Sequence, residues 1–213
     1  MNEMKNILIL GAHPDDVEFG MGGTLARIQR LKKSSIRVVI FSNCDESLPS
    51  GFETGTLTKE CIESLSIYGL DSSEIKFYDF KVRNFNQSRQ EILDVIIQEY
   101  RSAQFDTVFF PSSSDTHQDH RVVSHEAMRA CKKSTMLGYE MPWNTFESKK
   151  NFYFEISDKD LQVKINSIKK YQSQGNRQYA STIVQESVAI SGGVAIGKEF
   201  AEGFELIRGI FPL

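Results

Sequence analysis

Hydrophobic and polar positions alternate along the chain with two different periods. Short continuous apolar runs, typical of strands buried on both faces, cover residues 5–10, 36–41, 75–80, 105–110 and 136–141. Between these runs, apolar residues recur at helical spacing over residues 24–31, 58–68, 87–100 and 122–131. Strands and helices therefore alternate, which predicts an α/β fold with a doubly wound (Rossmann-like), mostly parallel sheet flanked by helices.

The pattern is less regular beyond residue 150. We predict an edge strand over residues 152–156 and a helix over residues 160–171, with Asp158 as its N-cap. Gly192 and Gly193 interrupt the next helical pattern, so we expect only a short helix over residues 195–200. Residues 204–210 fit either a strand or a helix. No linker or repeat divides the chain, and we expect a single domain over residues 1–213.

Composition narrows the class of protein. Hydrophobic residues make up 40% of the chain and charged residues 25%, and the formal net charge is −3. This balance argues against a nucleic-acid partner, and no apolar run approaches the length of a membrane span. The N-terminus does not resemble a signal peptide, and three cysteines without paired spacing indicate buried thiols, so we expect a cytoplasmic protein. The oligomeric state stays open, a homo-oligomer included.

A cluster of charged residues follows the first predicted strand. The segment GAHPDDVE places His13, Asp15, Asp16 and Glu18 directly after Gly11. Carboxylates so close together raise one another's pKa unless a cation lies between them, and imidazole with carboxylate suits Zn²⁺ and related divalent metals. Alternatively, Asp15 or Asp16 caps the free amides of a helix start. The turn lacks GxGxxG and its carboxylates would repel a pyrophosphate, which argues against a dinucleotide site.

A second cluster follows the fourth predicted strand. Asp115, His117, Asp119 and His120 lie between that strand and the next predicted helix. The carboxyl ends of parallel strands meet at one edge of a sheet, so both clusters can converge on a single ion. A catalytic zinc needs three protein ligands and an open position for water, and two ligands from the first turn with one from the second would meet this need. The remaining carboxylates and imidazole are then free for proton transfer. A two-metal phosphoesterase would need more carboxylate ligands than these turns supply.

The motif AHPDDxE, followed by GGTLA and by HQDH at residues 117–120, resembles the PIG-L/LmbE family of zinc-dependent N-deacetylases. Weaker matches are YQSQ at residues 171–174 and AEGFELIR at residues 201–208. The resemblance implies hydrolysis of the N-acetyl group of a small N-acetylglucosamine-type conjugate. It also implies Zn²⁺ as the cofactor, with Fe²⁺ or another divalent metal left open.

The same resemblance implies roles for individual residues. It assigns the metal to three ligands: His13, Asp16 and His120. The sequence alone does not separate Asp16 from Asp15, which the resemblance makes the general base that takes a proton from the attacking water. His117 would face the developing oxyanion as an imidazolium or protonate the leaving amine, and Asp119 would orient an imidazole. Glu18 would support the ligands or the turn.

The chain departs from the family pattern where many relatives carry a substrate-contacting arginine. Counted from Glu60, the matching position is Leu57. Four other residues are therefore candidates for binding the sugar or its aglycone: Arg83, Arg89, Trp143 and Arg177. Two other functions are retained: an amidase acting on a sugar–thiol or another acyl-amine conjugate, and a non-catalytic carbohydrate-binding module. The module is disfavoured because Asp15 and His117 are present although metal binding does not require them.

Overall fold

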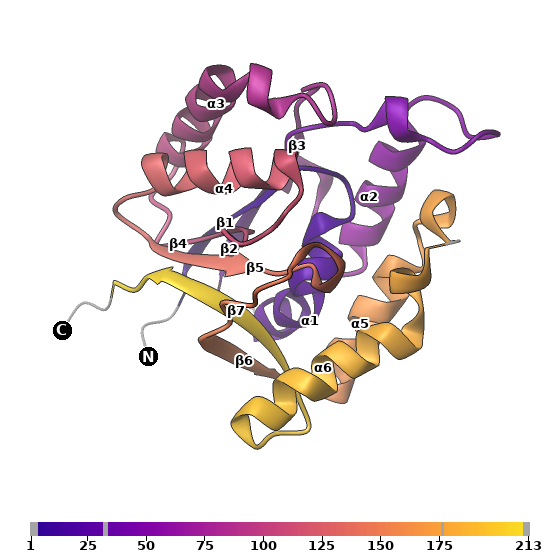
Figure 1. Ribbon diagram of the computed structural model, residues 1–213. Helices are drawn as coiled ribbons and strands as arrows, with labels where there is room; N and C mark the ends of the chain where they lie inside the picture. The colour runs from indigo at the N-terminus through magenta and orange to yellow at the C-terminus, as the bar shows by residue number, and fades with distance from the viewer. Residues whose placement is uncertain (1–3, 32–33, 176, 211–213) are drawn as a thin grey trace.

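The computed structural model describes residues 4–31, 34–175 and 177–210, which form a central sheet with helices on both faces (Figure 1). The strands are β1 (Asn6–Gly11), β2 (Ser35–Ile40), β3 (Ile75–Phe77), β4 (Thr107–Pro111), β5 (Thr135–Tyr139), β6 (Phe152–Ile156) and β7 (Phe200–Arg208). The α-helices are α1 (Asp16–Leu31), α2 (Thr56–Ser66), α3 (Arg89–Arg101), α4 (Gln118–Ala130), α5 (Asp158–Ile168) and α6 (Thr182–Ile196).

The sheet has the strand order β3-β2-β1-β4-β5-β7-β6. Strands β1 to β5 pair in parallel. Strand β7 runs antiparallel to both β5 and β6, and β6 forms the predicted edge strand. The chain moves outward from β1 to β3 and then returns to place β4 on the other side of β1. The predicted doubly wound, mostly parallel sheet is therefore confirmed. Strands β1 and β4 flank its topological switch point, where open α/β sheets bind ligands.

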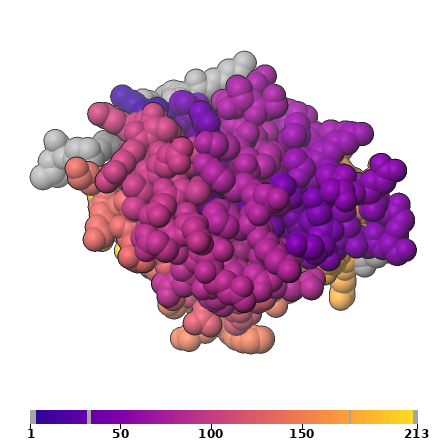
Figure 2. Space-filling model, turned by 90° about the horizontal axis from the view of Figure 1, so that it is seen from above, coloured from indigo at the N-terminus to yellow at the C-terminus, as the bar shows by residue number. Residues whose placement is uncertain are grey.

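Two hydrophobic layers enclose the sheet, and β1 contributes to both. Ile7 and Ile9 belong to the core on the side of α1, whereas Leu8 and Leu10 belong to the core beneath α3 and α4. Burial on both faces explains why β1 is an uninterrupted apolar run. Figure 2 looks onto the α3 side, where the surface is formed mainly by the first half of the chain.

Helix α1 begins at Asp16, eight residues earlier than the helical spacing predicts. Its first turns contain Gly20, where a Cβ would lie 2.2 Å from the ring of the buried Tyr139. The backbone leaves helical geometry at Met21, between the first turns and the rest of the helix. Gly20 therefore lets the start of α1 lie close against β5, beside the end of β1.

The prediction for the region before β7 is wrong. Gly192 and Gly193 do not interrupt a helix but lie inside α6, and the structure has no separate helix over residues 195–200. A Cβ on Gly192 would lie 2.2 Å from the carbonyl oxygen of Ala201 in β7. The glycines thus permit close packing of a helix on a strand, a tertiary requirement that local periodicity does not reveal.

Two smaller points concern the C-terminal third. The N-cap of α5 is Ser157 rather than Asp158, and it forms a reciprocal capping box with Asp160. Residues 204–208 belong to strand β7, which settles the choice between strand and helix. Within residues 4–31, 34–175 and 177–210, none of the helices combines the length and apolar character needed to cross a bilayer.

Candidate active site

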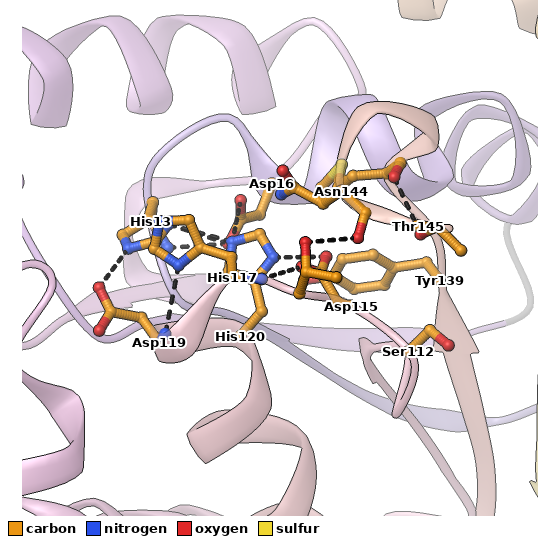
Figure 3. A network of polar contacts seen from close by, with 12 residues as sticks. His13, Asp16, Ser112, Asp115, His117, Asp119, His120, Tyr139, Asn144 and Thr145 are labelled. Carbon is orange, nitrogen blue, oxygen red and sulfur yellow. Dashed lines mark hydrogen bonds and ion pairs between the residues drawn. The ribbon is translucent and has the colours of Figure 1, made fainter. Parts of the chain in front are cut away.

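The loops that leave β1 and β4 bring the two charged clusters together (Figure 3). Nδ1 of His13 lies 3.1 Å from Nε2 of His120, although the two residues are 107 positions apart. Asp16, the first residue of α1, places Oδ1 3.2 Å from Nε2 of His120 and Oδ2 3.8 Å from Nδ1 of His13. Two imidazole nitrogens and one carboxylate thus converge at the end of β1.

The outward-facing nitrogens of these imidazoles are bound to carboxylates. Oδ2 of Asp119 lies 3.0 Å from Nε2 of His13, and Oδ2 of Asp115 lies 2.7 Å from Nδ1 of His120. A carboxylate on the far nitrogen fixes the orientation and tautomer of an imidazole and increases its basicity toward a metal. No role was predicted for Asp115. The sequence signal for its contact with His120 is its position five residues earlier, across the turn that leads into α4.

His117 occupies the N-cap of α4, where Nδ1 accepts a hydrogen bond from the amide of Asp119 at 3.2 Å. Its ring centroid lies 4.8 Å from that of His13 and 4.7 Å from that of His120. One ligand atom from each of these three histidines can be chosen so that all lie within 4.8 Å of one another. Burial, followed by the neighbouring imidazoles, lowers the pKa of His117 to about 4. A group with this pKa is uncharged at neutral pH, whereas the resemblance implied an imidazolium at His117 or a proton donor to the leaving amine.

Asp15 adopts a left-handed backbone conformation with φ of 92° and lines the cavity beside the histidines. Burial, together with the carboxylates of Asp16 and Glu18, raises the pKa of Asp15 well above its usual range. Asp16 is not a cap for the following turn, because its Oδ2 accepts a hydrogen bond from the preceding amide of His13 at 2.9 Å. Asp15 and Asp16 therefore have different surroundings in the structure, a difference that the sequence alone does not reveal.

The remaining charges form a buried ion pair and a buried acid. Burial disfavours the charge on Asp16, but His120 and His13 outweigh it and lower the pKa of Asp16 to about 2. Burial also opposes the charge on His120, yet Asp16 and Asp115 raise its pKa to about 10. The pKa of Glu18 rises to about 7 through burial, and its Oε1 accepts a hydrogen bond from the Tyr171 hydroxyl at 2.8 Å.

This donor set fits a divalent cation. Two imidazole nitrogens point at a buried carboxylate, and each imidazole is supported from behind by a second carboxylate. Such a mixture of imidazole and carboxylate suits Zn²⁺ and also Fe²⁺. A cation would also relieve the repulsion between the neighbouring carboxylates of Asp15 and Asp16.

A cavity of about 270 Å³ opens above this group. Three of the four residues predicted to bind substrate line it: Arg83, Trp143 and Arg177. Leu57, the position that the resemblance matches to the family arginine, is also part of its wall. Arg89 is not brought to this cavity, because Glu126 binds its Nη2 at 2.5 Å and its Nε at 2.9 Å. Its partner lies 37 residues along the chain, so the sequence did not reveal this pairing.

An aromatic wall, formed by Phe19, Trp143 and Tyr179, closes one side of the cavity. The rings of Trp143 and Tyr179 stack with centroids 4.0 Å apart at an angle of 13°, and Phe19 meets both edge-on. Gln174 lines the same cavity from the segment after α5. Trp143 was predicted as a substrate contact, whereas Gln174 was given no role because the segment after α5 has no regular period.

Comparison with known proteins supports the fold and the family. The diacetylchitobiose deacetylase of Thermococcus kodakarensis is 27% identical, over 99% of this chain and 86% of that protein. The N,N'-diacetylchitobiose deacetylase of Pyrococcus horikoshii superposes with a TM-score of 0.80 at 21% identity, covering 95% and 84% of the two chains. A 4-carboxy-2-hydroxymuconate hydratase from Pseudomonas putida, GalB, also reaches 0.80 at 18% identity over 99% of each chain, so the fold alone does not decide the reaction. Residues 8–131 match the model of the PIG-L family, GlcNAc-PI de-N-acetylase, and the chain therefore belongs to this family.

Proposed function

We propose that residues 1–213 act as one metal-dependent N-deacetylase domain that hydrolyses the N-acetyl group of a small amino-sugar conjugate. The observation that carries this proposal is the convergence of His13, His120 and Asp16 next to a second, separate carboxylate, Asp15. Metal binding alone needs no such extra carboxylate in the cavity, whereas amide hydrolysis needs a base there. The similarity to two diacetylchitobiose deacetylases supports an N-acetylated amino sugar as the substrate class.

His13, Asp16 and His120 would hold the divalent cation, for which Zn²⁺ is the first candidate. When bound, the cation supplies Lewis-acid polarisation of the amide carbonyl and lowers the pKa of coordinated water to about 7. Asp119 and Asp115 keep the ligand nitrogens of the two histidines directed inward.

Asp15 is the proposed general base. It takes a proton from the water that attacks the amide carbonyl and returns a proton to the departing amine. A general base works best when its pKa lies near the working pH, and burial with the neighbouring carboxylates moves the pKa of Asp15 in that direction.

His117 is the proposed hydrogen-bond donor to the carbonyl oxygen as negative charge develops there. Its Nδ1 accepts from the Asp119 amide, so the neutral ring carries its proton on Nε2. A donor held in place before the reaction stabilises the tetrahedral species without reorganisation. Cys44 also lines the cavity, but burial raises the pKa of its thiol, so it is not the thiolate that a cysteine nucleophile requires.

The test is a screen for acetate release from N-acetyl sugars, nucleotide-linked N-acetyl sugars and N-acetylglucosaminides. We expect acetate from at least one of them, loss of release with a chelator, and recovery when zinc is restored. Zinc-loaded protein that binds sugars but releases acetate from none of these compounds would instead support a carbohydrate-binding module.

A further inference from the structure

We propose that Gln174 determines sugar specificity by binding a hydroxyl group of the substrate, and that Glu60 is the residue that positions it, acting through Ser173. The inference rests on the proposed function, because it names a contact to the amino sugar of that reaction. Two features of the sequence have no part in the proposed mechanism: the segment YQSQ at residues 171–174, and Glu60, from which the position of Leu57 was counted. In the structure these two features contact one another.

Glu60 in α2 binds the YQSQ segment through both oxygens of its carboxylate. Its Oε1 accepts a hydrogen bond from the backbone amide of Ser173 at 3.0 Å, and its Oε2 accepts one from the Ser173 hydroxyl at 2.5 Å. Both residues are buried, although they are 113 positions apart in the chain. A buried carboxylate is costly unless it is hydrogen-bonded, so this pairing fixes both the backbone and the side chain of Ser173.

The YQSQ segment is fixed at its first residue as well. The buried Tyr171 donates its hydroxyl to Oε1 of Glu18, in the first turn of α1, at 2.8 Å. One buried carboxylate from α1 and another from α2 therefore hold the segment at alternate residues, Tyr171 and Ser173. The residue that follows, Gln174, lines the cavity that also contains Asp15.

The amide of Gln174 has hydrogen-bonding capacity left for a ligand. This side chain is buried, its Nε2 donates to Oγ of Ser173 at 3.3 Å, and its Oε1 accepts from Nε of Arg177 at 3.1 Å. A primary amide has two N–H donors and two acceptor lone pairs. Among the described residues, one donor and one lone pair of this amide therefore have no partner.

A free donor beside a free acceptor matches a hydroxyl group, which accepts one hydrogen bond and donates another. An amino sugar carries several hydroxyl groups around its ring. The cavity volume of about 270 Å³ is just below the range of about 300–1,000 Å³ that is typical of small-molecule sites, so a sugar ring that fills it approaches its walls closely. A sugar without the matching hydroxyl would leave the buried amide unpaired, and the site should reject it.

The test measures how much one hydroxyl group contributes to binding in the unchanged protein and in Gln174→Met. Methionine keeps the length of the side chain and removes its amide, while the Ser173 hydroxyl keeps Glu60 as its partner. The zinc-loaded proteins are titrated calorimetrically with methyl glucosaminide and with derivatives that each lack one of its hydroxyl groups. These sugars have no acetyl group for the enzyme to remove. For at least one derivative, the unchanged protein should bind about tenfold more weakly than it binds methyl glucosaminide, and in Gln174→Met that ratio should fall to about one.

The same ratio tests Glu60. Glu60→Ala releases Ser173 and should lower the ratio severalfold, whereas Glu60→Gln still offers an acceptor to the Ser173 amide and should keep most of it. Glu63→Ala is the matched control, because Glu63 lies on the exposed side of α2 and its loss should leave the ratio unchanged. A residue that only stabilised the fold would change the amount of folded, zinc-loaded protein but not this ratio.

The assignment of Gln174 would be overturned if every ratio persisted in Gln174→Met, if no derivative bound more weakly than methyl glucosaminide, or if none of these sugars bound measurably. An unchanged ratio in Glu60→Ala would overturn the positioning role of Glu60. Acetate release from an N-acetyl sugar without such a ratio would leave the proposed function intact, whereas the ratio without acetate release would count against the function alone.

Discussion

At the scale of single residues, the central question is which side chain completes the ligand set of His13 and His120. Asp16 contacts both imidazoles, whereas His117 lies near them but is engaged through Nδ1 as the N-cap of α4. The geometry permits a set of three histidines as well. We propose Asp16 because its carboxylate is buried and its pKa of about 2 keeps it anionic at any working pH.

Substitution of each candidate separates the two ligand sets. Asp16→Asn removes the anionic ligand. Loss of an outer hydrogen-bond partner lowers metal affinity by about 10- to 100-fold, and loss of this ligand should lower zinc affinity by more than that. His117→Asn removes the imidazole but keeps a good N-cap residue, so zinc binding should stay close to that of the unchanged protein. Zinc content measured after dialysis at defined free zinc decides the matter. Loss of zinc in His117→Asn with retention in Asp16→Asn would establish the three-histidine set.

The buried acid Glu18 gives a prediction about pH. Its pKa of about 7 lies above the ordinary value of 4.5, so above pH 4.5 the unfolded chain releases a proton that the folded protein still holds. The free energy of unfolding of metal-free protein should therefore fall as pH rises from 5 to 7, by about 2 kcal/mol from this group.

Glu18→Gln keeps an acceptor for the Tyr171 hydroxyl but cannot ionise. The difference in unfolding free energy between the two proteins, measured by urea denaturation in a chelator, should shift in favour of Glu18→Gln between pH 5 and pH 7. The buried amide of glutamine adds a cost that does not depend on pH, so only the change with pH is diagnostic. A difference that stays constant would show that Glu18 is not held protonated.

At the scale of elements, close packing decides where helices run. Helix α6 packs so closely on the chain at residues 198–201 that Gly192 and Gly193 have no room for a Cβ, and α1 approaches Tyr139 at Gly20 in the same way. In α6 the glycines lower helix propensity, yet the backbone is helical through them, whereas in α1 it leaves helical geometry at Met21, next to Gly20. In α6, packing against the neighbouring strand therefore outweighs the unfavourable helix propensity of glycine, which amounts to about 1 kcal/mol per glycine.

Gly192→Ala tests this account. Although alanine favours helix by about 1 kcal/mol, the added Cβ would lie 2.2 Å from the Ala201 carbonyl oxygen, a backbone atom that cannot rotate away. We expect a net loss of about 1–3 kcal/mol in unfolding free energy, typical of overpacking. The exposed neighbour Ser191 is the control, because Ser191→Ala should be neutral or slightly stabilising. A stabilised Gly192→Ala protein would show that α6 is not held against β7.

At the scale of the whole molecule, the sequence predicted the sheet and the central cluster well. The apolar runs identified β1 to β5, because strands buried on both faces need no alternation. The strand-ending positions of His13 and His120 then predicted their meeting, since parallel strands share an edge. These inferences need only short stretches of sequence and one topological rule.

What the sequence did not reveal depends on contacts between distant segments. Arg89 was predicted to be a substrate ligand but pairs with Glu126, and Asp115 received no role although it binds His120. Nothing local distinguishes a free arginine from a paired one. Gln174 belongs to the YQSQ match but received no role for a related reason, since it lies in an irregular segment that reaches the cavity only through the tertiary fold.

The central claim is that one set of residues holds the metal while Asp15 moves the proton. The most direct test measures bound zinc and acetate release on the same preparations of the unchanged protein and Asp15→Asn. Asparagine tolerates the left-handed φ of 92° at this position, so the fold should persist. We predict equal zinc, about one per chain, with acetate release reduced by about 100-fold or more in Asp15→Asn. Acetate release close to that of the unchanged protein at equal zinc would contradict the account.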